Sequence, residues 1–272
     1  MQIRKIGTYL ANLLKPEQLA ENLRHTTMKE DRLRFGDDTA EVTGVLVCWM
    51  ATAAAIKAAA HRHCNVIICH EDPYFQSFEV AVDLSAGWLA NRERLRLLLR
   101  HDIAVYCCHS PLDVLYTMAA ELDALQLDVK TLQRDWVSWI AEVPPLTIAE
   151  LAERARQGFK VPLVQVIGDP NRTVTRVGLS GGGMGLSFNS GYQEAHRRNG
   201  AEAIVTGEVD DYGAFWAEES GVAMIAVGHA ENENPGLRRF VECLKIDFPG
   251  LPAHFFECRT PGRMMGSMKR DS

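Results

Sequence analysis

The chain has 272 residues, of which 47% are apolar and 24% are charged, values typical of a folded globular protein and unlike those of a disordered one. This length allows one large domain or two small ones with a sizeable buried core. The formal net charge of −6 argues against nucleic acid or an anionic membrane as the main partner. An excess of carboxylates is instead compatible with a site that holds cations.

The seven cysteines lie mostly inside apolar runs, and none has the paired CxxC spacing of a zinc knot or a redox motif. We expect buried, reduced thiols in a reducing compartment. Residues 1–10 lack the apolar core of a secretory signal, and no run of roughly 18 apolar residues could span a membrane. These features predict a cytoplasmic protein that contacts no membrane.

Short β-branched runs alternate along the chain with alanine- and leucine-rich segments of helical spacing. The runs predict buried strands at residues 42–47, 66–69, 103–107, 174–179, 203–206 and 222–227. Helices are expected between them, for example at residues 51–60 and 89–99. Because this alternation is typical of βαβ units, the predicted fold is α/β, with mixed, mostly parallel sheets flanked by helices.

A break in this pattern falls at residues 125–145. It ends at a pair of prolines followed by Thr147 and Glu150, whose spacing is that of a capping box at the start of a helix. No Gly/Ser-rich run marks a flexible linker, so we interpret the break as a structural seam. We predict a first α/β half at residues 1–130 and a second at residues 131–272, together forming one compact unit.

The two halves resemble copies of one another. Residues 60–71 consist of a helix end, a short apolar strand and an acid just past the strand, and residues 195–208 repeat that order. A strand, a histidine and a carboxylate four residues later recur at residues 105–113 and 225–233. Identities are few and chance is an alternative, but the shared order of elements favours duplication, with the halves interlocked around a cleft.

Metal-ligating residue types stand at three of the expected strand ends. They are His70 with Glu71, His109 with Asp113, and His229 with Glu231 and Glu233. In parallel α/β sheets, ligands gather outside the carboxyl ends of the strands. Histidine and carboxylate together suit divalent ions such as Zn, Mn, Fe or Co, and the residues suffice for two ions. The sequence therefore predicts a two-metal site in the cleft between the halves.

Each of these residues also has a plainer interpretation. Asp113 could be the acid of a capping box that begins at Ser110. Glu233 could favour the positive end of a following helix, and His70 and His229 could be satisfied polar groups at the rim of a sheet. The remaining histidines are expected to be solvated: His25, His61, His63, His101, His196 and His254.

A glycine loop is the main rival feature. Gly181, Gly182 and Gly183 follow an expected strand and precede a helix expected at residues 191–198, so their amides could cradle a phosphate. Glu208 would then stand where a dinucleotide-binding fold places its ribose acid. The spacing is neither that of a dinucleotide fingerprint nor that of a P-loop, and a tight turn is the plainer alternative. A loop that lines the metal cleft and contacts a phosphate-bearing substrate would satisfy both interpretations.

Three segments together resemble the Nif-three-like family of dinuclear-metal-centre proteins, which are often labelled type-two GTP cyclohydrolase. Residues 66–75 are similar to the family's His-His pair followed by an aromatic, residues 105–113 to its Tyr-Ser-x-His-Thr-x-x-Asp motif, and residues 228–233 to its Gly-His-x-x-x-Glu motif. Residues 203–208 and the glycine loop at 180–185 also resemble family features. The likeness extends in order over nearly the whole chain.

This resemblance implies a set of metal ligands. They would be His70, Asp113, His229 and Glu233, with Glu71 at the place of the family's second histidine. His109 would then orient Asp113 or a bound water. Glu71 departs from the pattern, adds negative charge and shifts the preference toward harder ions. The resemblance also implies two divalent ions and a ring-shaped homohexamer.

Other departures concern the substrate and the reaction. Trp49 and Met50 stand where the family commonly has an Asp-Ala pair, and Asp211 with Tyr212 where a histidine often follows the Gly-Glu. The family's acidic-Asn-x-Gly-Leu stretch near the N-terminus is absent around Glu21–Gly36.

The predicted function is that of a metal-dependent hydrolase acting on a nucleotide-like or heterocyclic small molecule. Glu208 or Glu231 is the expected proton carrier. The substrate class follows from the family label alone, because fold and metal do not determine a substrate. The alternative, which the departures favour, is a metal-binding or regulatory protein without turnover.

Overall fold

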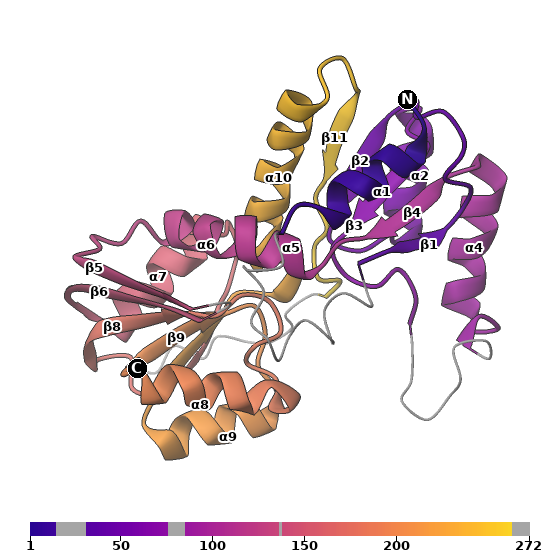
Figure 1. Cartoon of the computed structure of the whole chain (residues 1–272). Helices are drawn as coiled ribbons and strands as arrows, with labels where there is room; N and C mark the ends of the chain where they lie inside the picture. The colour runs from indigo at the N-terminus through magenta and orange to yellow at the C-terminus, as the bar shows by residue number, and fades with distance from the viewer. Residues whose placement is uncertain (15–30, 76–84, 136–137, 263–272) are drawn as a thin grey trace.

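The computed structural model describes residues 1–14, 31–75, 85–135 and 138–262. Two sheets with helices packed against them make up the molecule (Figure 1). The first sheet consists of β1 (Leu33–Phe35), β4 (Ala104–Cys107), β3 (Val66–Cys69), β2 (Val45–Cys48) and β11 (Ala253–Phe256), in that spatial order. The second consists of β5 (Thr131–Asp135), β6 (Ser138–Thr147), β8 (Thr173–Leu179), β9 (Ala203–Thr206), β10 (Ala223–Ala226) and β7 (Gln165–Ile167).

The first sheet is built around a βαβαβ unit. β2 leads through α2 (Ala53–His61) to β3, and β3 leads to β4, with α4 (Leu89–His101) preceding β4. The three strands are parallel, β11 adds a further parallel strand beside β2, and β1 is antiparallel to β4. Every residue of β2, β3 and β4 is buried, which explains why these strands are continuous apolar runs. The Thr52 side chain caps α2 by accepting a hydrogen bond from the Ala55 amide.

The second sheet contains an equivalent unit. β8, β9 and β10 are parallel, with α8 (Ser190–Arg198) after β8 and α9 (Asp211–Ser220) after β9. β6 flanks the unit on one side and β7 on the other, both antiparallel to their neighbours. The predicted α/β fold of mixed sheets flanked by helices is therefore confirmed.

The two sheets repeat one order of elements. The series α1 (Ile3–Ala11), β1, β2, α2, β3, α4 and β4 corresponds to α7 (Ile148–Gly158), β7, β8, α8, β9, α9 and β10. In each series the short first strand lies antiparallel beside the last, β1 on β4 and β7 on β10. This shared topology supports the duplication that the sequence indicated.

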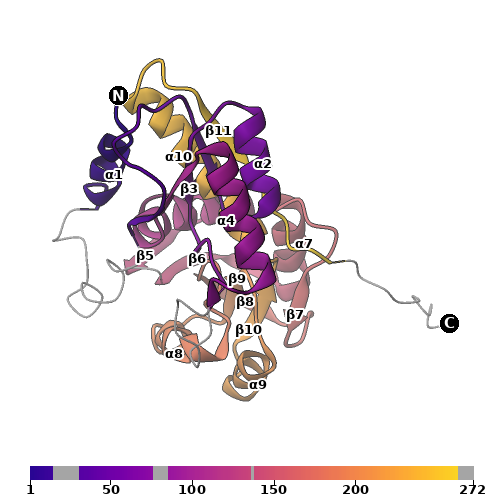
Figure 2. The ribbon, with the colours of Figure 1, turned by 90° about the vertical axis from the view of Figure 1, so that its right-hand side faces the viewer.

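The halves are interlocked through the end of the chain. After β10, α10 (His229–Asp247) packs on α6 (Met118–Leu125) and against β2 of the first sheet, and β11 then pairs with β2. In Figure 1, α10 stands between the two sheets, and Figure 2 shows it beside α1 and β11 from the perpendicular direction. Elements that follow residue 228 therefore complete the sheet that the N-terminal part of the chain begins.

The segment between the halves forms the antiparallel pair β5 and β6 rather than irregular structure. Pro144 and Pro145 lie within β6, where the register with β8 shifts between Glu142 and Leu146. Proline cannot donate to a strand ladder, so a bulge is where a strand tolerates it. The capping box at Thr147 is confirmed: its hydroxyl accepts from the Glu150 amide, and the Glu150 carboxylate accepts from the Thr147 amide.

Alternate residues of the first sheet pack against different helices. Val45, Val47 and Ile68 belong to the apolar cluster that contains α1 and α10 residues, whereas Leu46 and Ile67 belong to the cluster with α2 and α4. This alternation is the period-two pattern of a strand covered on both faces. Within the described ranges, no helix combines the length and the apolar character needed to cross a membrane.

Candidate metal centre

The predicted ligand residues converge where strands of both sheets end. His70 and Glu71 directly follow β3, and His109 follows the end of β4. Because β3 and β4 are parallel neighbours, these side chains emerge at the same edge of the first sheet. His229 and Glu233 come from the first turns of α10, which follows β10 of the second sheet. The site is thus assembled from segments that are distant in the sequence.

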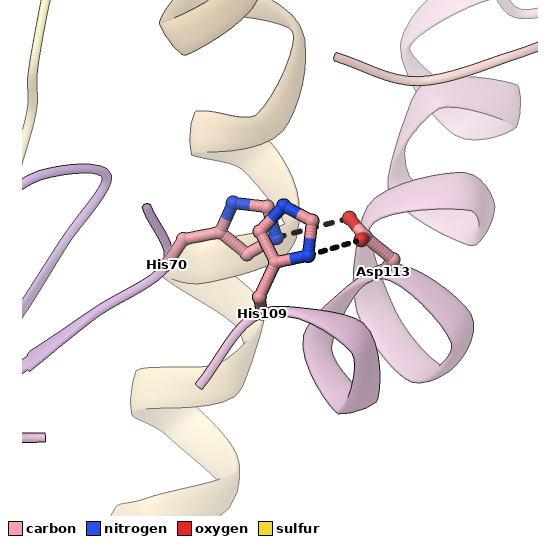
Figure 3. A group of neighbouring side chains, drawn as sticks. All are labelled: His70, His109 and Asp113. Carbon is pink, nitrogen blue, oxygen red and sulfur yellow. Dashed lines mark hydrogen bonds and ion pairs between the residues drawn. The ribbon is translucent and has the colours of Figure 1, made fainter. Parts of the chain in front are cut away.

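His70 lies at the centre of the cluster and is fully buried. Its Nε2 lies 2.9 Å from Oδ1 of Asp113, and its ring stacks on that of His109 with 4.4 Å between centroids (Figure 3). Its Nδ1 lies 3.1 Å from Oε2 of Glu233 but is not in hydrogen-bond geometry with any described group. A buried imidazole nitrogen without a hydrogen bond is costly, so this atom is oriented as a metal ligand would be.

Glu233 connects two histidines through its two carboxylate oxygens. Oε2 faces Nδ1 of His70 and accepts a 2.7 Å hydrogen bond from the indole Nε1 of Trp49. Oε1 lies 3.2 Å from Nε2 of His229. The side chain is buried, and its placement between two imidazoles is that of a carboxylate able to bridge two ions.

Glu71 points into the same cluster. Its Oε1 lies 3.4 Å from Nε2 of His109 and 3.4 Å from Nε2 of His229. The same oxygen lies 3.8 Å from Nδ1 of His70. The carboxylate that stands at the place of the family's second histidine is therefore central to the group of donor atoms.

Residues of the cluster that follow strands of the first sheet have counterparts at equivalent positions in the second sheet. His109 and Asp113 are four residues apart after β4, and His229 and Glu233 are four residues apart after β10. Glu71 and Glu208 each follow by two residues the middle strand of a three-stranded parallel unit, which is β3 in the first sheet and β9 in the second. Each of these two acids faces a histidine that follows the next strand, Glu71 facing His109 and Glu208 facing His229.

Asp113 does not cap a helix. No side chain caps α5 (Ser110–Leu112), and Asp113 begins the π-helical turn η3 (Asp113–Thr117). The Thr117 hydroxyl donates to the Asp113 carbonyl at 3.0 Å, and the carboxylate turns toward His70 and His109. Single π turns within helices occur frequently at functional sites. The capping alternative for Asp113 is thus wrong.

The structure also does not match the plainer interpretation of Glu233, in which it favours the positive end of a following helix. It lies inside α10, which begins at His229 and continues through Pro235, so no new helix starts after it. Its carboxylate faces the cluster rather than a helix terminus.

The cluster attracts positive charge. Burial lowers the pKa of His70, but the charges of Glu233 and Asp113 outweigh it and hold that pKa well above its usual value. Burial likewise lowers the pKa of His109, yet the Asp113 charge contributes to raising it to about 10. Burial raises the pKa of Glu71, but hydrogen bonds from His109 and His229 bring it well below the usual range. Three carboxylates around the buried His70 therefore draw protons onto their histidine neighbours, and bound cations would replace those protons.

The donor set fits divalent ions. Two groups of three residues bring their ligand atoms within 4.8 Å of one another: His70 with His109 and Asp113, and His70 with Glu71 and Glu233. His109, which the resemblance implied as an orienting residue, lies as close as the expected ligands. Nδ1 of His229 is hydrogen-bonded to Glu208 at 2.8 Å, which leaves Nε2 facing the cluster, as metal-bound histidines usually require.

The glycine loop approaches the cluster with its backbone. A Cβ atom on Gly182 would lie 2.1 Å from Oε1 of Glu233, so only glycine fits there without displacement. The Gly181 amide donates to buried Glu121 at 3.1 Å, and the Gly182 amide donates to Asn232 at 2.9 Å. Two amides expected to cradle a phosphate are therefore bonded to the protein's own side chains. The Gly182 backbone therefore lies directly beside Glu233 and His229 of the candidate site.

The remaining predicted site residues lie at the edge of the cluster or point away from it. Gly183 lies beside the His229 ring, and its carbonyl accepts a hydrogen bond from Asn189 at 2.9 Å. Glu231 turns toward the segment after β11, where its carboxylate accepts from the Thr260 amide at 2.8 Å and from its hydroxyl at 2.9 Å. Glu208 alone of the two expected proton carriers contacts the cluster.

One of the histidines expected in solvent is buried. His61, His63 and His101 are exposed, His254 is half-buried and His25 lies outside the described residues. His196 is fully buried in α8, with Nε2 3.1 Å from the Leu179 carbonyl and Nδ1 2.9 Å from the Tyr192 carbonyl. It is a core residue whose imidazole lies between two backbone carbonyls, and burial lowers its pKa.

Sequence reasoning missed three residues that support the cluster. Trp49 donates to Glu233 and packs edge-on against His229 with 5.1 Å between ring centroids. Glu121 and Asn232 fix the glycine loop by accepting hydrogen bonds from the amides of Gly181 and Gly182. Only Trp49 carried a signal, because it follows a predicted strand at a position where the family pattern differs.

An α/β protein of two interlocked sheets with a histidine–carboxylate cluster at their joined edges is the class that this fold and site define. The model of the Duf34/NIF3 (NGG1p interacting factor 3) family matches residues 1–261. The chain therefore belongs to this family.

Relatives of known name share a label. The chain is 30% identical over 213 residues to a "GTP cyclohydrolase 1 type 2 homolog" of Neisseria meningitidis serogroup B, covering 76% of this chain and 81% of that protein. It is 25% identical over 238 residues to a protein of the same label from Chlamydia pneumoniae, covering 84% and 89%.

Solved structures share the fold. One titled "protein ybgI, unknown function" superposes with a TM-score of 0.78 at 23% identity, covering 96% of this chain and 100% of that one. A Bacillus cereus "protein related to NIF3" superposes with a TM-score of 0.77 at 15% identity, covering 98% and 99%.

Proposed function

We propose that the cluster holds two divalent ions and that the protein is a metal-dependent hydrolase of a nucleotide-like or heterocyclic small molecule. The observation that carries this proposal is the pair of ligand groups that share the buried His70. The label of the relatives, which names them homologues of a GTP cyclohydrolase, supports the substrate class.

The chain's own residues have distinct roles in this proposal. The ions would be held by His70, Glu71, Asp113, His229 and Glu233. When bound, two divalent ions lower the pKa of water to near neutrality and polarise the bond to be cleaved. Glu233 can span both ions because its oxygens face different histidines. Trp49 keeps that carboxylate in orientation through its indole N–H.

Glu208 is the proposed proton carrier. Its carboxylate is hydrogen-bonded to Nδ1 of His229 and its side chain is 45% exposed, so it reaches both the cluster and solvent. A carboxylate in this position can accept a proton at the site and release it to water. Glu231 is the weaker candidate because Thr260 occupies both of its oxygens.

The identity of the ions should follow from the donor set. Three carboxylates and three histidines face one another, and Glu71 supplies oxygen where the family supplies nitrogen. Oxygen-rich sites favour harder ions, so we propose Mn or Fe over Zn.

The test is metal content combined with a substrate panel. Elemental analysis of protein loaded with Mn should give about two ions per chain, and the loaded protein should hydrolyse at least one member of a panel of phosphoesters, cyclic amides and GTP. Asp113→Asn should lose bound metal and turnover together, because it removes a donor beside His70. Asp128→Asn, an exposed acid outside the cluster, is the matched control and should behave like the wild type.

Two outcomes would overturn parts of the proposal. Absence of bound metal after loading with Mn, Fe or Zn would reject the metal site itself. Two ions per chain without turnover across the panel would reject the hydrolase and leave a non-catalytic metal-binding or regulatory protein, in which the ions serve structure, storage or partner control.

We also propose that the chain forms a homo-oligomer, a hexamer by resemblance to its family. Exposed aromatic rings at Phe188, Tyr212 and Phe215, on neighbouring elements of the second half, offer a contact surface for a second copy. Light scattering after size-exclusion chromatography measures the mass, and a monomer at micromolar concentration would reject this assembly.

A further inference from the structure

The acids of the candidate metal centre are paired with histidines. Oxygens of Glu71, Asp113 and Glu233 lie between 2.9 and 3.8 Å from the imidazole nitrogens of the buried His70. Within the described ranges, no lysine or arginine forms an ion pair with any of these three carboxylates. Histidine binds a metal ion in its neutral form, so the expected ligands bring three negative charges and no positive charge to the loaded centre.

Two further carboxylates flank the centre without being expected ligands. Asp31, two residues before β1, accepts a 2.5 Å hydrogen bond from the backbone amide of His109. Glu208 is bonded to Nδ1 of His229 at 2.8 Å and lies at the exposed side of the cluster. Two divalent ions bring four positive charges, against which the centre sets five carboxylates. The loaded centre therefore has no excess of positive charge that would hold an anionic ligand.

Two arginines contact the segment that follows Glu71 instead of the cluster. Arg34 of β1 forms an ion pair with Asp72 at 2.6 Å. Arg94 of α4 is buried and donates a hydrogen bond to the Pro73 carbonyl. Arginine is the usual protein partner of phosphate and carboxylate groups. In the part of the chain that the structure describes, neither guanidinium is bonded to a residue of the metal centre.

The glycine loop does not compensate for the missing arginine. Besides the bonds from the Gly181 and Gly182 amides to side chains, the Met184 amide donates to the Gly181 carbonyl at 3.3 Å and the Leu186 amide to the Gly183 carbonyl at 3.1 Å. A phosphate-binding loop instead directs successive amides at the anion. The charges of the centre and the bonding of the loop therefore point independently to a ligand without phosphate.

The groups that remain at the cluster suit an uncharged or cationic ring. The Trp49 indole is half-buried and lies beside His229, with 5.1 Å between ring centroids. Aromatic faces bind planar heterocycles by stacking and cations through the ring quadrupole. The exposed Glu208 carboxylate is an acceptor for N–H groups, which a nitrogen heterocycle offers and a phosphate does not.

We propose that the ligand of this centre is a phosphate-free nitrogen heterocycle, uncharged or cationic, such as a nucleoside or a cyclic amide. This inference rests on the proposed metal site and narrows the substrate class of the proposed hydrolase, because it excludes phosphorylated nucleotides. The formal net charge of −6 acts in the same direction by repelling anions at a distance.

The test compares ligands that share a ring and differ in an anionic group. Guanosine is paired with guanosine monophosphate, and dihydrouracil with dihydroorotate. Each is titrated by calorimetry into the full chain, loaded with Mn and desalted, at pH 8. At about 50 mM salt we expect the uncharged member of at least one pair to bind roughly tenfold more tightly. At about 0.5 M salt this preference should shrink, because the charges are screened.

Charge-neutral variants distinguish electrostatics from shape. Asp31→Asn keeps an oxygen acceptor for the His109 amide but removes a charge, and Glu208→Gln removes the exposed charge. Each should reduce the preference about threefold. Asp128→Asn, at an exposed acid outside the cluster, is the matched control and should leave the preference unchanged. Metal content is measured for every sample, so that a loss of ions is not mistaken for a change in selectivity.

The inference is overturned if the uncharged member binds more tightly in neither pair, or if neither guanosine nor dihydrouracil binds up to millimolar concentration. Turnover measured on the same samples decides the hydrolase separately. Preferential binding of the uncharged rings without hydrolysis would support this inference and reject the hydrolase. Hydrolysis of GTP, with guanosine monophosphate binding as tightly as guanosine and dihydroorotate as tightly as dihydrouracil, would reject the inference and support the hydrolase.

Discussion

Replacing Gly182 by alanine would place a methyl group inside the candidate metal cluster. The added Cβ would lie 2.1 Å from Oε1 of Glu233 and 2.6 Å from Nε2 of His229. The carboxylate oxygen would have to retreat by about 1.3 Å to reach the 3.4 Å at which ordinary contact begins. The alternative is that the glycine loop moves, but its amides are tied to Glu121 and Asn232.

The expected loss of metal affinity follows from this displacement. Metal–ligand distances tolerate only about 0.2 Å, so a shift of this size removes the carboxylate from its position. Disturbing even the partners of metal ligands typically costs about 10–100-fold in affinity. We expect Gly182→Ala to weaken Mn binding by roughly 100-fold or to reduce the stoichiometry to one ion. Isothermal titration calorimetry in a chelator-treated sample measures both.

A second glycine supplies the matched control. Gly182 has φ of +38° and Gly221 has φ of +68°, so alanine at either position costs about 1–2 kcal/mol of backbone strain. Nothing lies within 4 Å of a Cβ on Gly221, so Gly221→Ala should lose stability in urea unfolding but keep wild-type metal binding. If Gly182→Ala binds Mn with the affinity and stoichiometry of the wild type, the inference that a methyl group at this position displaces the Glu233 carboxylate from the ions is refuted.

Three further predictions concern the residues around the cluster. Trp49→Phe removes the N–H donor to Glu233 and should weaken Mn binding about tenfold in calorimetry; unchanged affinity would mean that the indole does not orient the ligand. Glu208→Gln removes the negative charge beside His229 and should also weaken Mn binding about tenfold, with Glu257→Gln, at an acid outside the cluster, as a control that leaves it unaltered. Burial raises the pKa of Glu121 from 4.5 to about 8, so the folded state prefers the protonated carboxyl, and the stability present below pH 4.5 is lost as the pH rises toward 8. Between pH 6 and 8, in the presence of chelator, the unfolding free energy of the wild type should therefore fall by about 2 kcal/mol more than that of Glu121→Gln. Equal pH slopes of the two proteins in urea unfolding would contradict this.

The central strands and the capping box were predictable because their signals are local. Strands buried on both faces are mostly apolar, and β2, β3, β4, β9 and β10 carry such runs. The edge strands carry no comparable signal: β1 and β7 have three residues each, and β5 is largely exposed. A short or exposed strand is stabilised by pairing with its neighbour, and its own residues therefore need no distinctive pattern.

The types of donor residue and their places at strand ends could also be read from the sequence. A histidine or acid just after a buried parallel strand emerges at a defined edge of the sheet, and this rule brought His70, Asp113 and His229 into one expected site. The rule does not determine where each side chain turns. Glu231 and Glu233 are two residues apart on α10, yet Glu231 binds Thr260 and Glu233 faces the histidines.

Local sequence patterns were enough to predict the α/β class, the central strands and the residue types that follow them, because periodicity and residue type act over a few neighbouring positions. The tertiary structure alone decided that β11 completes the first sheet and that His196 is a core residue. It also decided that Trp49, Glu233 and the Gly182 backbone meet in one cluster, although they come from distant parts of the chain. Such contacts depend on how α10 packs between the sheets, and no local pattern encodes which distant surface a buried helix face will meet.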